Sequence, residues 1–506
     1  MSYSLFDLIL VATPLLAGLL LLSVWQEGRR RVQEIPGPKR WPVVGNYFSP
    51  KRVYEQFAAP SNEFGPIFGL KIFSKNMVMV TSVPIARELL ESRSAIYSNR
   101  LPQKMAELCG FQEGMLFQTN SNKLRQGRKL VSMGLAQRQL ERYSHIYSVH
   151  TATFLANLLE SPDNFLHHIR KLPVGLILEV AYGYKVQGDN DPMILRSEEW
   201  VEHFAKATSV TDFLVNWFPI LEHIPAWFPG GGFKKTAEDW RRRANEFSWD
   251  AYHAVHSAVQ RGEAPHSVIS SVLTDTPGQY DEDVIVYSAA QIMSGGADTT
   301  VCTLSTFMLA MVLHPEVQQR AKAEIDRVLG PNKLPTADDW DELPYIASVV
   351  REVIRWHPAV PLLFRNNTED DVYNGYVIKK DSMIVTNYWA MLHNKDIFPD
   401  HRAFRPERWS EVQLDKDIDP FEIAFGFGRR SCPGKASAKE LLFTVIASVL
   451  ATFDINCAKD AHGNDIVPKE EFTDVAIVGP IPFKCLITPR SEHSRQLIED
   501  TLQSLR

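Results

Sequence analysis

Apolar side chains recur at helical spacing along most of the chain after residue 83. This pattern predicts helices over 84–93, 122–142, 144–160, 165–183, 193–218, 234–261, 281–312, 314–329, 344–356 and 433–452. Alternating apolar positions predict two short strands within 64–82, further short strands over 359–390, and strands and loops over 453–488. The sequence therefore predicts a mainly α-helical body with a minor β-sheet.

The first residues differ from this body. The stretch 4–25 reads SLFDLILVATPLLAGLLLLSVW and carries one charge, Asp7, and about 20 apolar residues suffice to cross a bilayer core. Three arginines follow at 29–31, which favours a cytosolic body. A cleaved signal peptide is the alternative, but no basic residue precedes the run and no small-x-small site follows it. We expect an anchor and basic flank over 1–31, a Pro-rich hinge over 32–46 and a single catalytic domain over 47–506.

A second long apolar run covers 284–313 and contains one charge, Asp298. Its length would allow a membrane span, but an ionisable residue at the bilayer centre is costly. The adjacent Gly295 and Gly296 also weaken a helix interior, by about 1 kcal/mol each. We expect a long helix buried in the body, with a functional reason for its interrupted centre.

Composition narrows the function classes. The chain has 506 residues, a formal net charge of −6 and no basic run beyond three residues, which argues against nucleic-acid binding. Its five cysteines are scattered, without a CxxC pair, and do not form a disulfide framework. A reducing compartment fits this cysteine usage.

One cysteine lies in an unusual setting. In FGFGRRSCPGKASAKE, residues 425–440, Arg429 and Arg430 precede Cys432 and a predicted helix follows it. Nearby cations, backbone N–H groups at Gly428 and Gly434, and a helix N-terminus would lower the pKa of this thiol. The loop lacks the several ligands of a zinc site, whereas a single thiolate suits an iron held by a porphyrin. A buried structural cysteine in a turn is the alternative.

This loop is similar to the signature of the cytochrome P-450 family, F-x-x-G-x-R-x-C-x-G, at Phe425, Gly428, Arg430, Cys432 and Gly434. Three further motifs resemble those of the family in order and spacing: GGADTT over 295–300, EVIR over 352–355 and FRPERW over 404–409. E-x-x-R alone is nonspecific, since Glu238/Arg241 and Glu324/Arg327 share the spacing. Its place before the other motifs gives it weight.

The resemblance implies a P-450-like haem-thiolate fold in which Cys432 is the axial ligand of haem b. It assigns haem propionates to Arg430, Arg365 and Arg128, and arginine suits carboxylates. The family's usual Trp four residues before Arg128 is Leu124 here, so one propionate contact is in doubt. The resemblance also implies a buried charged triad, which would brace the Cys loop: Glu352, Arg355 and Arg408.

The centre of the long helix resembles the oxygen-activation site of the family. There, Gly295 and Gly296 would let the backbone pass over a flat cofactor. Thr299 would hold a water or bound oxygen, and Asp298 would relay protons. The alternative is a Thr hydroxyl that hydrogen-bonds to its own helix.

The resemblance implies a monooxygenase that inserts one oxygen atom from O2 into a lipophilic small molecule. No flavin fingerprint is present, so we expect electrons from a separate NADPH-cytochrome reductase, with cytochrome b5 as a second candidate partner. We expect a single-pass protein of the endoplasmic reticulum membrane with a cytosolic body. The stretch 224–242 looks like fungal members that tailor secondary metabolites, and terpenoids, polyketides and indoles all remain open. The substrate pocket is expected from 97–122, about 200–245, 288–299, 359–364 and 476–480.

Two other function classes stay open at this point. One is a haem-binding sensor or electron carrier, and the other is a family member that isomerises or dehydrates its substrate without a reductase. Asp298 and Thr299 favour the monooxygenase, because neither alternative needs an oxygen-activation site.

Overall fold

The computed structural model describes residues 34–119, 121–188, 190–209, 212–413 and 415–505, so the predicted anchor over 1–31 lies outside the described residues. The chain divides into two compact units. The sheet unit comprises the described part of Met1–Leu101 with Leu362–Met391 and Phe427–Arg429, and the helical unit comprises Pro102–Pro361, Leu392–Gly426 and the described part of Arg430–Arg506. The single catalytic domain over 47–506 stays a prediction.

A four-stranded sheet in the order β1-β2-β6-β3 forms the centre of the sheet unit, with β2 and β6 parallel and the other neighbours antiparallel. Its inner face packs Phe57, Phe68, Met79 and Val385, which are all buried. The elements of this unit are α2 (Val53–Ala58), α3 (Ser61–Phe64), β1 (Ile67–Ile72), β2 (Lys75–Val80), α4 (Val83–Arg87), α5 (Ser94–Tyr97), β3 (Leu362–Asn366), β4 (Asp371–Tyr373), β5 (Tyr376–Ile378), β6 (Met383–Asn387) and α17 (Tyr388–Leu392).

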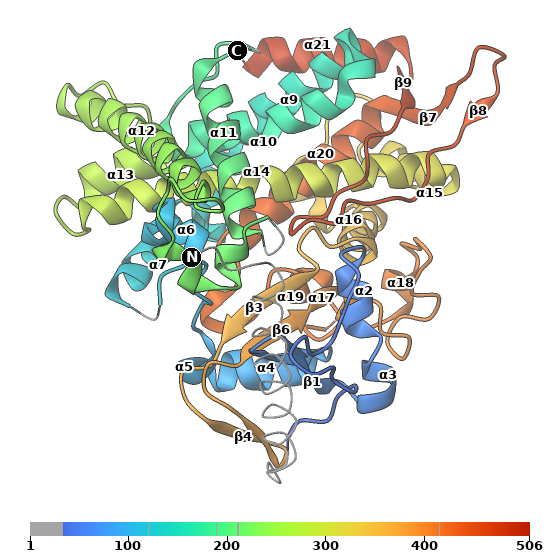
Figure 1. Cartoon of the computed structure of the whole chain (residues 1–506). Helices are drawn as coiled ribbons and strands as arrows, with labels where there is room; N and C mark the ends of the chain where they lie inside the picture. Colours follow the sequence, from blue (N-terminus) through green and yellow to red (C-terminus); the bar gives the residue numbers. More distant parts are fainter. Residues whose placement is uncertain (1–33, 120, 189, 210–211, 414, 506) are drawn as a thin grey trace, which may run out of the picture. The chain divides into compact units, whose positions relative to one another are not determined.

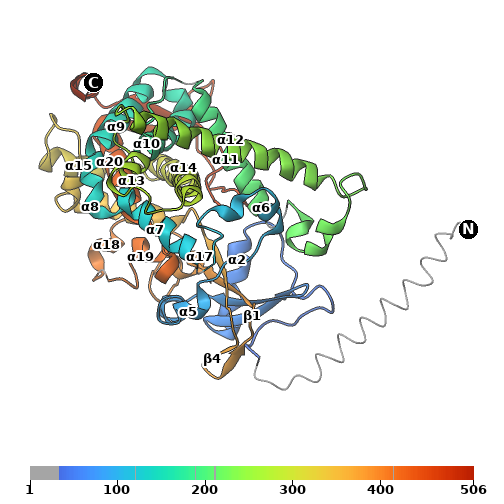
Figure 2. The same cartoon turned by 90° about the vertical axis from the view of Figure 1, so that its left-hand side faces the viewer.

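The helical unit is built around one long helix, α14 (Glu282–Leu313). Figure 1 shows α14 running along the unit, and Figure 2 looks nearly down its axis. The other helices of this unit are α6 (Lys104–Leu108), α7 (Asn122–Leu135), α8 (Gln137–Leu140), α9 (Ser144–Glu160), α10 (Phe165–Tyr182), α11 (Pro192–Thr208), α12 (Phe233–Gln260), α13 (Val268–Asp275), α15 (Pro315–Val328), α16 (Pro344–Trp356), α18 (Arg408–Glu411), α19 (Pro420–Ile423), α20 (Lys435–Thr452) and α21 (Glu492–Leu505). α14 contacts α10, α7, α16 and α20.

Among the described residues, α14 alone is long and apolar enough to cross a membrane, and most of its apolar length is buried inside the structure. This burial agrees with the prediction of a core helix. Pro315 follows its C-terminus and starts α15, because proline suits the first turn of a helix.

A three-stranded sheet lies in the helical unit. Its strands β7 (Phe453–Lys459), β8 (Asp465–Ile466) and β9 (Cys485–Pro489) are ordered β8-β7-β9 and are antiparallel. A long segment connects β8 to β9 (Figure 1).

The predicted fold class, mainly helical with minor sheets, is confirmed by these elements. One predicted helix is wrong in its second half: α11 ends at Thr208, and Leu214–Asn216 and Pro219–His223 form short 3₁₀ turns. Pro219 and Pro225 disfavour an α-helix there. Among the described helices of eight residues or more, two were not predicted, α13 with its Ser267 capping box and the C-terminal α21.

Candidate active site

The Cys loop, residues 424–434, joins α19 to α20 in a tight turn. The backbone N–H of Cys432 donates a hydrogen bond to the carbonyl of Phe425 at 2.7 Å. The ring of Phe425 stacks on Phe421 of α19, with 5.7 Å between centroids. Gly434 is the N-cap residue of α20. These contacts set Cys432 at the positive end of an 18-residue helix.

Cys432 is an exposed residue. The protein atoms around its sulfur still disfavour the charged thiolate, and this desolvation raises the pKa of the thiol. Three interactions oppose this effect and lower the pKa of the thiol: a hydrogen bond from the Gly434 N–H, and the positive charges of Arg128 and Lys435. We expected Arg429 and Arg430 in that role. Arg430 donates its guanidinium N–H groups to the backbone carbonyls of Met115 and Gln118, and its effect on the thiol stays a prediction.

Two predicted arginines of the helical unit lie at the Cys loop, Arg430 within the loop and Arg128 on α7. Arg430 is buried and donates to the carbonyls of Met115, at 3.1 Å, and Gln118. Arg128 of α7 donates from Nη2 to the carbonyl of Ser431 at 3.1 Å, and burial lowers its pKa. Arg128 is therefore held against the loop that carries Cys432, and Arg430 anchors that loop to the segment 115–118.

Leu124 occupies the first turn of α7, one turn before Arg128. Its side chain is buried, and its N–H donates to Oγ of Ser121, the N-cap residue, at 3.2 Å. A leucine at this position packs into the core and has no side-chain N–H to offer, so the helix keeps its cap but lacks the donor that a Trp would supply.

Two predicted site residues belong to the sheet unit. Arg365 on β3 is 2% exposed and donates to the carbonyl of Phe364 at 3.3 Å. Gly428 has φ +63°, and a Cβ there would lie 2.0 Å from the carbonyl oxygen of Leu90. The glycine is therefore required by close backbone approach and a left-handed conformation. This corrects our view that Gly428 brings an amide to the thiol, a role that Gly434 fills.

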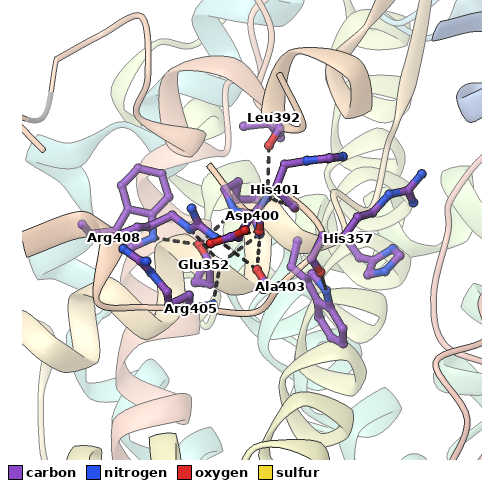
Figure 3. A network of polar contacts seen from close by, with 12 residues as sticks. Glu352, His357, Leu392, Asp400, His401, Ala403, Arg405 and Arg408 are labelled. Carbon is purple, nitrogen blue, oxygen red and sulfur yellow. Dashed lines mark hydrogen bonds and ion pairs between the residues drawn. The ribbon is translucent and has the colours of Figure 1, made fainter. Parts of the chain in front are cut away.

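Glu352 and Arg408 lie together in the helical unit, as Figure 3 shows, and Arg355 bonds to the same Glu352 carboxylate. Arg355 donates from Nε and Nη2 to the two Glu352 oxygens at 2.9 Å each, and Arg408 donates from Nε at 3.1 Å. The N–H of Arg405 and the indole of Trp409 donate at 2.8 and 3.1 Å. Five N–H groups thus converge on one carboxylate.

The guanidiniums of this triad also hold the chain before α18. Arg355 and Arg408 donate their remaining N–H groups to the carbonyls of Leu392, Pro399, Asp400, His401 and Ala403. Glu352 and Arg355 are fully buried, and Arg408 is 4% exposed. α16, which carries Glu352 and Arg355, packs against α19 and α20 on either side of the Cys loop.

The two glycines at the centre of α14 have different surroundings. A Cβ on Gly295 would meet no atom within 4 Å, apart from its chain neighbours and its own helix backbone, whereas a Cβ on Gly296 would lie 2.4 Å from Cδ1 of Ile177. Gly295 thus faces open space, and Gly296 allows α10 to pack closely on α14. The prediction that both glycines make room for a cofactor therefore fits Gly295 alone.

The polar residues of this turn each have a partner. Thr299 donates from Oγ1 to the carbonyl of Gly295 at 2.8 Å, the helix bond that the alternative predicted. The carboxylate of Asp298 pairs with Nη1 of Arg170 on α10 at 3.3 Å. Arg170 was not predicted, since it lies 128 residues earlier in the chain and no local motif marks it.

Comparisons with known proteins decide the family. A model of the cytochrome P450 family matches residues 35–485. The chain is 36% identical over 497 residues to Cytochrome P450 monooxygenase 105 of Postia placenta, which covers 96% of this chain and 95% of that protein. The chain belongs to the cytochrome P450 family. Two other fungal cytochrome P450 relatives are claR of Ampulloclitocybe clavipes, 36% identical over 93% of this chain and 89% of its own, and CLM2 of Gibberella zeae, 34% identical over 97% and 95%.

A solved structure supports the same fold. The chain superposes on a zebra fish cytochrome P450 with a TM-score of 0.71 and 21% identity, over 88% of this chain and 100% of that one. Its mainly helical body with small sheets is therefore the cytochrome P450 fold, and the enzyme is a haem-thiolate monooxygenase.

The residues of this P450 fit a haem. Among the described residues, no group of three His, Cys, Asp or Glu could hold a bare metal ion. Cys432 thus offers a single sulfur, which suits an iron whose other ligands come from a porphyrin. Arg128 and Arg430 place two cations beside the same loop, and guanidinium groups pair well with carboxylates such as propionates.

Proposed function

We propose that this P450 is a membrane-anchored monooxygenase that inserts one oxygen atom from O2 into a lipophilic small molecule, in fungal secondary metabolism, with electrons from a separate NADPH reductase. The observation that carries the proposal is Cys432, exposed at the N-terminus of α20 and hydrogen-bonded by the Gly434 N–H. Such a thiol is set to bind the iron of haem b. Bound haem supplies O2 activation, and a thiolate ligand favours O–O cleavage.

In this proposal Arg430 and Arg128 neutralise the haem propionates from the helical unit. Arg365 keeps the propionate role that the resemblance assigns to it. Phe425, Gly428 and Gly434 shape the Cys loop. The triad fixes α16, which packs on both helices that flank the loop.

Asp298 and Thr299 would deliver protons to the reacting oxygen. The Thr299 hydroxyl already donates to the Gly295 carbonyl, so it offers its lone pairs to a water as an acceptor. Asp298 lies on the same helical turn as Thr299, and Arg170 of α10 pairs with its carboxylate and orients it. This turn lies beside Gly295, the glycine with open space at its face.

Aromatic side chains support a lipophilic substrate. Phe111 and Phe117, from the segment expected to line the pocket, meet Trp200 and Phe204 of α11. Trp200 and Phe204 stack with 5.4 Å between their centroids. Ligand pockets are mainly apolar and aromatic with a few polar groups. The zebra fish P450 was solved with progesterone, a lipophilic small molecule of the kind we propose here.

The fungal relatives support a role in fungal secondary metabolism, with terpenoid or polyketide tailoring as the proposed reaction class. For the reductase, Arg125 and Lys129 on α7 are exposed cations. Lys435 and Lys439 of α20 are half-buried. Because Arg125 and Lys129 are the more exposed cations, we assign first contact with the reductase to α7, and cytochrome b5 would use the same face. A single anchor over 4–25 in the endoplasmic reticulum membrane would leave this face in the cytosol.

The proposal that Cys432 would hold the haem iron is tested by Cys432→Ser, with Cys457→Ser as control. The control should keep the red-shifted Soret band of the reduced carbon monoxide complex, and Cys432→Ser should lose it. Survival of that band in Cys432→Ser would overturn the proposal.

The reaction is tested separately. Microsomes that hold the protein and a reductase are incubated with a fungal metabolite extract, NADPH and isotopically labelled O2. One labelled oxygen atom in an apolar product is the expected result. Product formation without label would assign the enzyme to the isomerase or dehydratase class instead.

A further inference from the structure

Cys457 on β7 and Cys485 on β9 are directly opposite each other in an antiparallel ladder, and both are free thiols. Opposite residues point to the same face of a sheet, with Cβ atoms about 4.5–5.5 Å apart. The neighbouring pair on this face, Ile455 and Ile487, is buried, so the two cysteines continue the inner face of the small sheet. Cys485 is buried and Cys457 is half-buried.

In this ladder the two cysteines form a non-hydrogen-bonded pair, the type in which opposite Cα atoms lie closer together. Arg490 donates its N–H to the carbonyl of Thr452 at 2.9 Å, directly opposite in register, so that pair is hydrogen-bonded. Pair types alternate along an antiparallel ladder. The pairs at 453, 455 and 457 are therefore non-hydrogen-bonded. The contacts of Gln318 agree with this alternation. Its side-chain oxygen accepts from the N–H of Ile455 at 2.9 Å, and its side-chain NH2 donates to the carbonyl of Ile455 at 2.8 Å, so neither backbone group bonds to Ile487.

Non-hydrogen-bonded pairs bring opposite Cα atoms to about 4.5 Å, whereas hydrogen-bonded pairs hold them near 5.5 Å. Disulfides span Cα separations of about 4.4–6.8 Å with Cβ atoms about 3.5–4.5 Å apart. The pair of Cys457 and Cys485 thus needs only a small approach of its Cβ atoms to be bridged. A disulfide in a reducing compartment is usually transient and redox-sensing.

We propose that Cys457 and Cys485 form a dithiol–disulfide switch that a small disulfide, such as glutathione disulfide, oxidises. Cys457, the more accessible sulfur, attacks one sulfur of glutathione disulfide, which breaks that S–S bond and releases one glutathione. Cys485 then attacks the sulfur of Cys457 in the mixed disulfide and releases the second glutathione. The two protein thiol protons end on the two glutathione thiols, so atoms and electrons balance.

Burial raises the pKa of both thiols, that of Cys485 to about 12. Neither thiolate is therefore stabilised in the reduced pair, which favours the disulfide at equilibrium and makes its formation slow.

A disulfide between Cys457 and Cys485 would join the two ends of the segment 458–484 into a covalent loop. Near its C-terminal end, this segment contacts α14 and the chain that follows α16. There the N–H of Val478 donates to the carbonyl of Ala359 at 2.8 Å, and a Cβ on Gly479 would lie 2.7 Å from Sγ of Cys302 on α14. Cys302 is one helical turn after Asp298. Oxidation would therefore restrict the motion of a segment packed beside the central turn of α14.

The test equilibrates the purified holoenzyme with glutathione buffers of increasing oxidised fraction, then alkylates it under denaturing conditions and maps its peptides by mass spectrometry. We expect a peptide that links Cys457 to Cys485 and vanishes after reduction with dithiothreitol. Cys109 and Cys302 serve as controls within the same molecule and stay alkylated. In Cys485→Ala, Cys457 should instead retain bound glutathione.

Two results would overturn the proposal. One is alkylation of Cys457 and Cys485 in the oxidised wild type to the same extent as Cys109 and Cys302. The other is stable glutathione on Cys457 of the wild type, because Cys485 would then fail to reach it. Hydrogen exchange of 467–484 tests the consequence: amide exchange should slow in the linked form, and an unchanged rate would refute the switch.

Discussion

Replacing Glu352 by glutamine removes one negative charge from the buried triad and changes the shape of the side chain little. In the wild type the carboxylate accepts five N–H donors, including two from Arg355 and one from Arg408. A glutamine keeps one acceptor oxygen and places an NH2 group against donors. Glu352→Gln should therefore leave two buried guanidiniums without their counter-charge.

The expected cost follows from burial. Glu352 and Arg355 are 0% exposed, so solvent cannot replace the lost charge. Breaking a buried ion pair from one side destabilises a protein by about 3–5 kcal/mol. Arg355 and Arg408 keep their bonds to backbone carbonyls in Glu352→Gln, which places the expected loss in the free energy of unfolding at about 3–4 kcal/mol.

The measurement is urea unfolding of the haem-loaded protein, followed by circular dichroism and by the Soret band. Glu238→Gln is the matched control, because Glu238 begins another E-x-x-R on α12 but is exposed. A surface change of this kind stays within about 0.5 kcal/mol. The reasoning would be refuted by a Glu352→Gln protein that keeps its haem and unfolds within about 1 kcal/mol of the wild type.

The remaining predictions concern the centre of α14 and one sequon. Thr299→Ala should keep its haem spectrum and consume NADPH, while product per NADPH falls and hydrogen peroxide rises; Thr299→Ser should restore coupling, and unchanged coupling in Thr299→Ala would place the proton path elsewhere. Both Gly296→Ala and Gly295→Ala should gain the same helix propensity, but the new Cβ of Gly296→Ala would clash with Ile177. The free energy of unfolding in urea should therefore be lower for Gly296→Ala by about 1–3 kcal/mol, and equal values would contradict this packing. Asn366, in the glycosylation sequon Asn366-Asn367-Thr368, should stay unglycosylated because the body faces the cytosol, and a mobility shift on endoglycosidase treatment would disprove that topology.

Much of the fold could be predicted, because long amphipathic helices repeat their pattern over many turns. α9 begins and ends where its apolar spacing predicts, at residues 144 and 160. The pattern failed after α11, where Leu214 and Phe218 continue the apolar spacing of the predicted helix over 193–218 but are exposed. Periodicity shows only that apolar residues recur at helical spacing. A helix prediction from this spacing assumes that these residues are buried.

The candidate site could be predicted where its motif is continuous, as in the Cys loop. Its electrostatics could not, because the cations that act on Cys432 are Arg128 and Lys435, and only folding brings Arg128 there. The same holds for Arg170 opposite Asp298. The roles of Gly296 and Gly428 depend on the neighbours Ile177 and Leu90, which no local spacing specifies.

The E-x-x-R motif shows why spacing alone carries little information. Glu324 of α15 begins one copy of this motif, and its spacing alone predicts no more than a solvated ion pair. In the structure its carboxylate is buried and accepts the N–H groups of Tyr345 and Ile346, in the first turn of α16. It therefore stabilises the helix whose last turns hold Glu352 and Arg355. One copy of the motif thus caps the helix that carries the other, and α16 is fixed at its start by a carboxylate from α15 and near its end by the triad.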